Sequence, residues 1–144
     1  MKKFLVVFMM LFSVIGIKAS SFYTATSVAC SINNAPWSDW CGLNCLFVID
    51  QEQKQIRVYS DISYSTYTNK FSINSGSTQI IDYGTAVTTY GTNGQGYSYR
   101  LETLRGNDSN CSNCTMFFYV FNDGDLMFVI RYADVSYKYM LSRR

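Results

Sequence analysis

The stretch that decides the fold is MFFYVFNDGDLMFVIRY, residues 116–132. Residues 116–121 are apolar on both faces of an extended strand, and a second such run, residues 125–132, follows Asn122-Asp123-Gly124-Asp125. The Asp-Gly step supplies the positive-φ residues that a tight hairpin turn requires. The stretch therefore predicts two antiparallel strands joined by a short turn.

Alternating patterns extend this prediction in both directions along the chain. Residues 97–102 and 135–141 alternate apolar and polar side chains, the period of a half-buried strand. In the first of these segments we expect Leu101 on the buried face and Glu102 on the polar face. Residues 91–96 are glycine-rich, but no helix follows them to hold a phosphate, so they predict a hairpin loop.

Helical periodicity is nearly absent after the first 20 residues, whereas Tyr, Thr, Ser, Val and Ile abound. The sequence therefore predicts an all-β fold, a single antiparallel up-and-down sheet of about seven or eight strands. Such a sheet protects its edges by closing into a small barrel or a curled sandwich, and the sequence leaves both open. The remaining expected strands are an edge strand at 22–29, a hairpin of 45–50 and 56–60 around the connector 51–55, and weaker strands at 64–73 and 78–83.

The N-terminus has the pattern of a secretory signal peptide. Lys2 and Lys3 precede an apolar run of about fourteen residues, 4–17, which is too short to cross a bilayer as a helix. Small residues follow, so we expect cleavage after Ala19 or Ser20. The domain division is then a cleaved leader, 1–20, and one β domain, 21–144, which is secreted, periplasmic or at the cell surface and has no transmembrane segment after processing.

The charge balance of the mature chain argues against a nucleic-acid partner. Removing the leader takes away three lysines, which leaves nine basic residues against ten acidic ones. The basic residues are scattered along the sequence, with no basic run to follow a phosphate backbone.

Five cysteines remain after processing, and in an exported chain they predict disulfides. They are Cys30, Cys41, Cys45, Cys111 and Cys114. A bridge from Cys41 or Cys45 to Cys111 or Cys114 closes a loop of about seventy residues, which stabilises by ~4 kcal/mol in the chain-entropy model. Local bridges, Cys41–Cys45 and Cys111–Cys114, are the alternative pairing. A zinc site on these four cysteines and a lipid anchor on Cys30 are further alternatives that the sequence favours less.

The sequence offers no catalytic constellation, and we predict no catalytic residue, metal or cofactor. The chain has no histidine, which removes the usual general base and the commonest zinc ligand. Only two glutamates occur, Glu52 in a predicted turn and Glu102 on a strand, so paired carboxylates are not signalled.

Aromatic side chains are the most unusual feature, with twelve Tyr, ten Phe and two Trp. We expect most of them to form the core and cross-strand pairs. The segment Trp37-Ser38-Asp39-Trp40 differs, because it lies in an irregular polar stretch. Its indoles are expected to plug a barrel end or, if exposed, to bind a glycan with Asp39 accepting hydroxyl hydrogen bonds.

The segment from Trp37 to Trp40, residues 47–50 and 56–60, and the closing residues 126–139 together resemble small secreted proteins of Bacteroidota without known activity. The resemblance rests on strand patterns over most of the mature chain. It implies an exported bacterial β fold and carries over no catalytic or ligand-binding residue.

These observations favour an exported, non-enzymatic binding or interaction module that uses an aromatic surface or a barrel mouth. Its expected partner is a glycan, a small apolar ligand or a protein. Two alternatives stay open: a secreted hydrolase or hydrolase inhibitor with disulfide-held loops, and a structural component of a cell-surface assembly with Cys30 exposed for intermolecular bonding.

Overall fold

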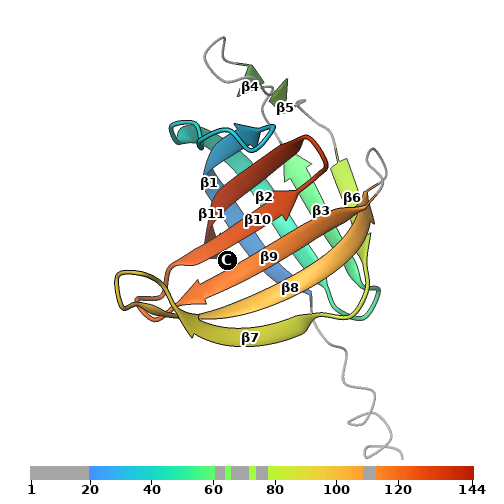
Figure 1. Ribbon diagram of the computed structural model, residues 1–144. Helices are drawn as coiled ribbons and strands as arrows, with labels where there is room; N and C mark the ends of the chain where they lie inside the picture. Colours follow the sequence, from blue (N-terminus) through green and yellow to red (C-terminus); the bar gives the residue numbers. More distant parts are fainter. Residues whose placement is uncertain (1–19, 61–63, 66–71, 74–77, 109–112) are drawn as a thin grey trace, which may run out of the picture.

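The computed structural model describes residues 20–60, 64–65, 72–73, 78–108 and 113–144, and these residues form an all-β, antiparallel structure without a helix (Figure 1). Nearly all of the predicted leader lies outside the described residues. The strands are β1 (Ser21–Ile32), β2 (Cys41–Asp50), β3 (Gln55–Ser60), β4 (Tyr64–Ser65), β5 (Ser72–Ile73), β6 (Thr78–Tyr83), β7 (Val87–Thr92), β8 (Ser98–Asp108), β9 (Cys114–Phe121), β10 (Leu126–Arg131) and β11 (Val135–Arg143).

Eight strands form a closed up-and-down barrel in the order β6-β3-β2-β1-β11-β10-β9-β8, and β6 pairs with β8 to close it. The short pair β4–β5 lies between β3 and β6 in the chain, and β7 is an additional strand on the edge of β8 (Figure 1). The predicted up-and-down sheet is confirmed, and of the two predicted closures the structure has the barrel.

The hairpin at residues 116–132 is confirmed. β9 pairs with β10 from Val120↔Leu126 to Thr115↔Arg131. Gly124 has φ +93°, and the backbone N–H of Asp125 donates to Asp123 Oδ1 at 2.9 Å. The hairpin around the 51–55 connector is confirmed too, since β2 pairs with β3 on either side of it.

One strand prediction is wrong and one strand was not predicted, for different reasons. β1 was expected at an edge, but it pairs with both β2 and β11, since closing the barrel joins the first strand to the last. β7 was not expected at all, because its residues are almost all exposed and carry no alternating pattern. Most of the predicted strand at 64–73 lies outside the described residues.

The barrel wall opens beside β8. β8 pairs with β6 only through its last residues, from Gly106↔Tyr83 to Asp108↔Ile81, and the same edge pairs with β7 from Thr103↔Val87 onward. The segment that pairs with β3 therefore ends at Tyr83, and the next strand, β7, pairs with β8 alone. The wall is continuous at one end of the barrel and open at the other.

The core fills the barrel interior with aliphatic and aromatic side chains. The largest fully buried ones are Phe47, Phe128, Ile56, Ile81, Met116 and Val28. Phe47 lies at the centre, with ring centroids 5.3 Å from Phe128 and 5.0 Å from Tyr139. These tilted and edge-to-face contacts join β2, β10 and β11 across the barrel.

Candidate functional site

A cavity of about 310 Å³ lies at the open end of the barrel. Its inner part is formed by four buried core side chains, Ile56, Leu104, Phe118 and Phe128. Its rim combines the β2–β3 turn, the 84–86 connection after β6, and the middle of β8. We call this cavity the barrel mouth.

The barrel mouth contains Glu102, contrary to its predicted place on the solvent-facing side of β8. Glu102 lies two residues before Leu104, which is 5% exposed in the core, so both side chains face the barrel interior. Leu101 and Tyr99 therefore lie on the outer face, where the Tyr99 ring contacts Tyr119 at 5.7 Å. The alternation was recognised, but its phase was wrong, because water reaches the inner face at the open end.

Polar groups at the rim have both signs of charge. Glu102 Oε1 lies 3.7 Å from Arg100 Nε, a solvent-screened pair that leaves Glu102 able to accept a hydrogen bond. Burial, together with the nearby carboxylates of Asp50 and Glu102, raises the pKa of Tyr83 above its usual range. The Tyr83 hydroxyl therefore stays protonated at neutral pH and can donate a hydrogen bond.

The rim is tied together by the β2–β3 turn. The backbone N–H of Gln53 donates to Asp50 Oδ1 at 2.9 Å, and Lys54 adopts φ +52°. The Lys54 carbonyl then accepts a hydrogen bond of 2.9 Å from the backbone N–H of Tyr83. The turn is thereby fixed to β6, and the exposed Lys54 stands at the edge of the mouth.

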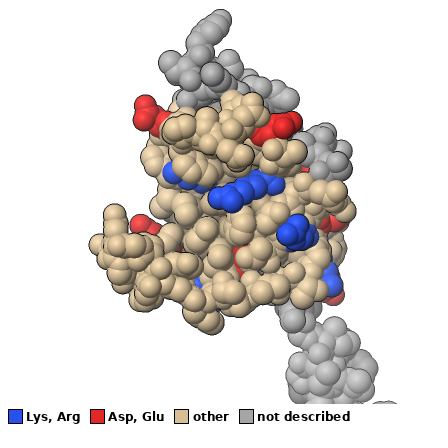
Figure 2. All heavy atoms as spheres, viewed as in Figure 1, with Lys and Arg blue, Asp and Glu red and all other residues tan. Residues whose placement is uncertain are grey.

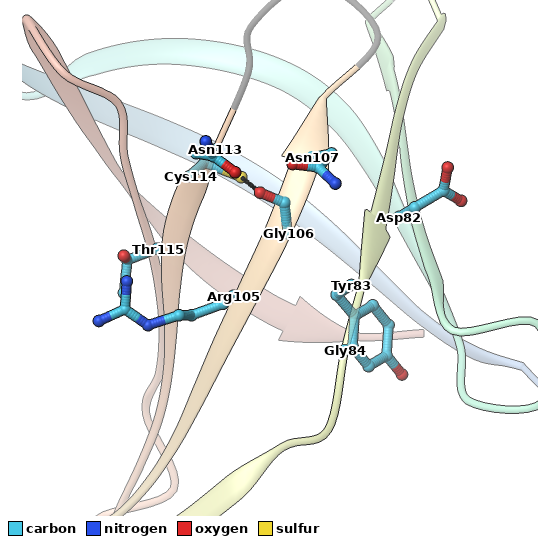
Figure 3. A pocket seen from close by; sticks show the side chains of 9 residues that line it. All are labelled: Asp82, Tyr83, Gly84, Arg105, Gly106, Asn107, Asn113, Cys114 and Thr115. Carbon is cyan, nitrogen blue, oxygen red and sulfur yellow. Dashed lines mark hydrogen bonds between the residues drawn. The ribbon is translucent and has the colours of Figure 1, made fainter.

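A second hollow, of about 520 Å³, lies outside the barrel where β6 meets β8 (Figure 3). In Figure 3, Asp82 on β6 lies on one side of it and Arg105 on β8 on the other, and the Cys114 Sγ on β9 donates to the Gly106 carbonyl at 3.3 Å. Asp82 already accepts a hydrogen bond from Gln55 Nε2 at 3.0 Å. This hollow has no apolar floor comparable to that of the barrel mouth.

A buried polar cluster lies away from the mouth, around the end of β8. Asp108 is 8% exposed, and its Oδ2 accepts hydrogen bonds from Gln79 Nε2 and, at 2.5 Å, from the Tyr132 hydroxyl. Burial raises the pKa of Tyr132, and the hydrogen bond to Asp108 raises it further. The cluster satisfies its own polar groups and joins β6, β8 and the residue after β10.

The predicted disulfides are not formed among the described cysteines, Cys30, Cys41, Cys45 and Cys114. Cys41 and Cys45 lie on one extended strand, too far apart for a bridge, since about 3.3 Å per residue separates them. Cys114 on β9 forms no disulfide with either of them, although Cys45 and Cys114 both belong to the buried core. Cys111 lies outside the described residues.

Within the described residues, the structure supports neither an exposed Cys30 nor a zinc site. Cys30 is 4% exposed, so it is not available at the surface, and burial raises its pKa. No group of three or more His, Cys, Asp or Glu side chains in this part of the chain could hold a metal ion.

The predicted ligand-binding residues Trp37, Asp39 and Trp40 lie on the outside of the barrel in the β1–β2 connection. Trp37 is 37% and Trp40 45% exposed, so the indoles do not plug a barrel end. They enclose the Lys138 ammonium instead, with Nζ 4.7 Å from the Trp37 ring centroid and 4.8 Å from that of Trp40. Burial in this clamp lowers the pKa of Lys138.

Lys138 is a site residue that the sequence does not reveal. The alternation of residues 135–141 predicts only a polar residue between Tyr137 and Tyr139. The barrel mouth and the clamp formed by Trp37 and Trp40 occupy different surfaces. Lys138 is on the outer face of β11, whereas the side chains that form the mouth are on the inner face of the barrel.

Comparisons with protein-family models, with curated proteins and with solved structures find no match for this chain. Within the described residues, no helix is long and apolar enough to span a membrane.

Proposed function

We propose that the protein is a non-enzymatic binding module that holds a small ligand in the barrel mouth. The observation that supports this most is the connection of the apolar core to a polar rim through one cavity of about 310 Å³. A volume of this order is at the small end of ligand sites, which combine an apolar lining with a few polar groups that orient the ligand.

The lining defines the class of ligand. Phe118, Phe128 and Leu104 provide an apolar floor for a compact aliphatic or aromatic body. Tyr83 donates a hydrogen bond and Glu102 accepts one, so a polar group on the ligand would remain at the rim. The proposed ligand is therefore a compact amphipathic molecule with its polar end toward solvent.

A binding role agrees better with the rim than a hydrolytic one does. Within the described residues, Glu102 is the only carboxylate that lines the barrel mouth. The chain also has no histidine to act as a general base.

The proposal places this module outside the cytoplasm of a bacterium, as the predicted leader implies. Cleavage after Ala19 or Ser20 would remove only residues that precede β1 at Ser21, and the barrel would keep every strand. Intact-mass measurement of the exported protein is expected to give a chain that starts at Ser20 or Ser21. A chain that retains Met1, or one that starts at a lipidated Cys30, would contradict this part of the proposal.

The ligand site is tested with the fluorescent probe 8-anilino-1-naphthalenesulfonate, which has an aromatic body and one charged end. We expect the wild-type protein to bind it with increased fluorescence and Ala86→Trp to lose most of that binding, because an indole at the rim fills the cavity. Val87→Trp is the matched control, since Val87 is 59% exposed and does not line the cavity.

Both variants must unfold cooperatively on heating, so that probe binding to a loosened core is not mistaken for binding at the mouth. Equal fluorescence of wild type and Ala86→Trp would show that the probe does not enter the barrel mouth, and the proposal would be wrong.

A further inference from the structure

Three cationic side chains lie near one another on the outer face of the sheet although they come from separate parts of the sequence. Arg105 on β8 and Arg131 on β10 both pair with Thr115 of β9, which places them two strand spacings, about 10 Å, apart. Arg131 also pairs with Ser136 of β11, and Lys138 is two residues, about 7 Å, further along β11. Figure 2 shows the blue side chains as a band across the middle of this face. We call these three residues the cationic band.

The charge of the cationic band is not neutralised within the described part of the chain. The ion pairs there involve Arg57 with Asp50 and Arg100 with Glu102, and no described carboxylate oxygen lies within 4.0 Å of a band nitrogen. The expectation that the basic residues are scattered holds along the sequence, but the barrel brings these three together.

Aromatic rings, rather than carboxylates, hold two of these cations in place. Lys138 Nζ lies between the indoles of Trp37 and Trp40, and the Arg131 guanidinium carbon lies 5.3 Å from the Phe117 ring centroid. A cation–π contact restrains a cation but does not cancel its charge. Both groups are thus held in position for an anion from outside.

We propose that this face binds an acidic polysaccharide, a chain whose sugar rings carry carboxylate or sulfate groups. Arg105, Arg131 and Lys138 would hold successive anionic groups of the chain. The exposed parts of the Trp37 and Trp40 indoles would pack against the apolar C–H faces of the sugars, and Asp39, exposed between them, would accept hydroxyl hydrogen bonds.

The residues around the band favour a polysaccharide over other polyanions. Duplex DNA carries one charge per about 1.7 Å and is bound through many cations, whereas this face offers three, with Asp39 beside them. Anionic membranes are recognised by clusters of about four to eight Lys or Arg. A sparsely charged chain with uncharged, apolar ring faces fits three cations and two indoles better.

The test uses the folded mature protein and two probes, polygalacturonate for carboxylate groups and heparin for sulfate groups, with uncharged dextran for comparison. We expect binding to one or both acidic chains in about 50 mM NaCl, and none to dextran. The triple variant Arg105→Gln, Arg131→Gln, Lys138→Gln is expected to weaken binding at least tenfold. The control Arg143→Gln removes an exposed cation on the opposite side of β11 and is expected to change binding less than twofold.

A second variant separates the indoles from the charges. Replacing Trp37 and Trp40 with Ala should weaken binding about fivefold even in 0.5 M NaCl, where the charge contribution is largely screened. All variants should unfold at temperatures close to that of the wild type and bind the anilinonaphthalene probe normally. The outcome for this face is therefore independent of the outcome for the barrel mouth.

Three results would overturn the proposal. The first is that wild type binds neither polygalacturonate nor heparin, and the second is that Arg143→Gln weakens binding as much as the triple variant does. The third is that duplex DNA or phosphatidylglycerol vesicles bind more tightly than both polysaccharides through the same three cations, which would assign the face to that partner.

Discussion

Gly106 lies where β8 pairs with β6 and leaves no room for a side chain. A Cβ atom at this position would lie 2.6 Å from the Asp82 carbonyl oxygen and 2.9 Å from the Met116 Cε. The first contact is with backbone of the neighbouring strand, so it cannot be relieved by a side-chain rotation. Glycine therefore fits the β6–β8 pairing that closes the barrel without displacing its neighbours.

Gly106→Ala should therefore destabilise the protein by about 1–3 kcal/mol, the usual cost of forcing extra volume into a packed site. The urea midpoint of unfolding measures this loss. Gly94→Ala is the matched control, because a Cβ there meets no atom within 4 Å. A Gly106→Ala midpoint equal to that of Gly94→Ala would mean that the β6–β8 contact relaxes freely.

At the scale of strands, β8 shows what the sequence could reveal and what it could not. Its period-two pattern was recognised, yet both of its faces contain apolar and polar residues, so the pattern alone did not fix which face is buried. The face is decided by Leu104 and Met116, which meet inside the barrel across β8 and β9. Neither residue belongs to the alternating segment 97–102.

Leu104 and Leu101 test this assignment directly. Leu104→Ala should cost about 2–5 kcal/mol of unfolding free energy, because it leaves a cavity in the core. Leu101→Ala should cost less than half as much, since Leu101 lies half-buried on the outer face. Denaturant unfolding of both variants gives the comparison, and a larger loss at Leu101 would show that β8 faces the other way.

The sequence predicted individual hairpins, but it left open whether the sheet closes as a barrel or a sandwich and which distant strands pair, for one physical reason. The turns at Asp123-Gly124 and at the 51–55 connector depend on local chemistry, which the sequence displays. The β1–β11 pairing, the β6–β8 pairing and the cationic band depend on contacts between residues far apart in the chain. Both candidate sites are assembled by these distant contacts. Only three of their residues, Trp37, Asp39 and Trp40, could therefore be predicted from the sequence as ligand-binding residues.

At the scale of the whole molecule, the barrel presents two surfaces that do not share residues. Leu104, Phe118 and Phe128 line the mouth from inside the barrel, and the cationic band lies on the outer face, on β8, β10 and β11. On β8, for example, Leu104 lines the mouth and the next residue, Arg105, belongs to the cationic band. A change confined to one face of β8 should leave the other surface intact.

Burial of tyrosines throughout the barrel should make the whole protein sensitive to alkali. Burial raises the pKa of Tyr83, Tyr119, Tyr132 and Tyr139 above the ordinary value of about 10. Above that pH, tyrosines of the unfolded chain lose their protons while these tyrosines of the folded chain keep theirs. The unfolded state then binds fewer protons, so the free energy of unfolding must fall as the pH rises.

The opposing contribution comes from Lys138, whose lowered pKa means that the unfolded chain holds this proton to a higher pH. One lysine acts against four tyrosines and Cys30, whose pKa is also raised, so we expect the loss of stability to dominate. Urea midpoints at pH 8, 9, 10 and 11 should stay level up to about pH 9 and then fall. Tyr139→Phe removes one of these ionisations, so its urea midpoint should fall less steeply with pH than that of the wild type. Tyr90→Phe, at a residue 81% exposed, should not change this slope. Equal slopes for the two variants would show that burial of Tyr139 does not govern the alkaline response.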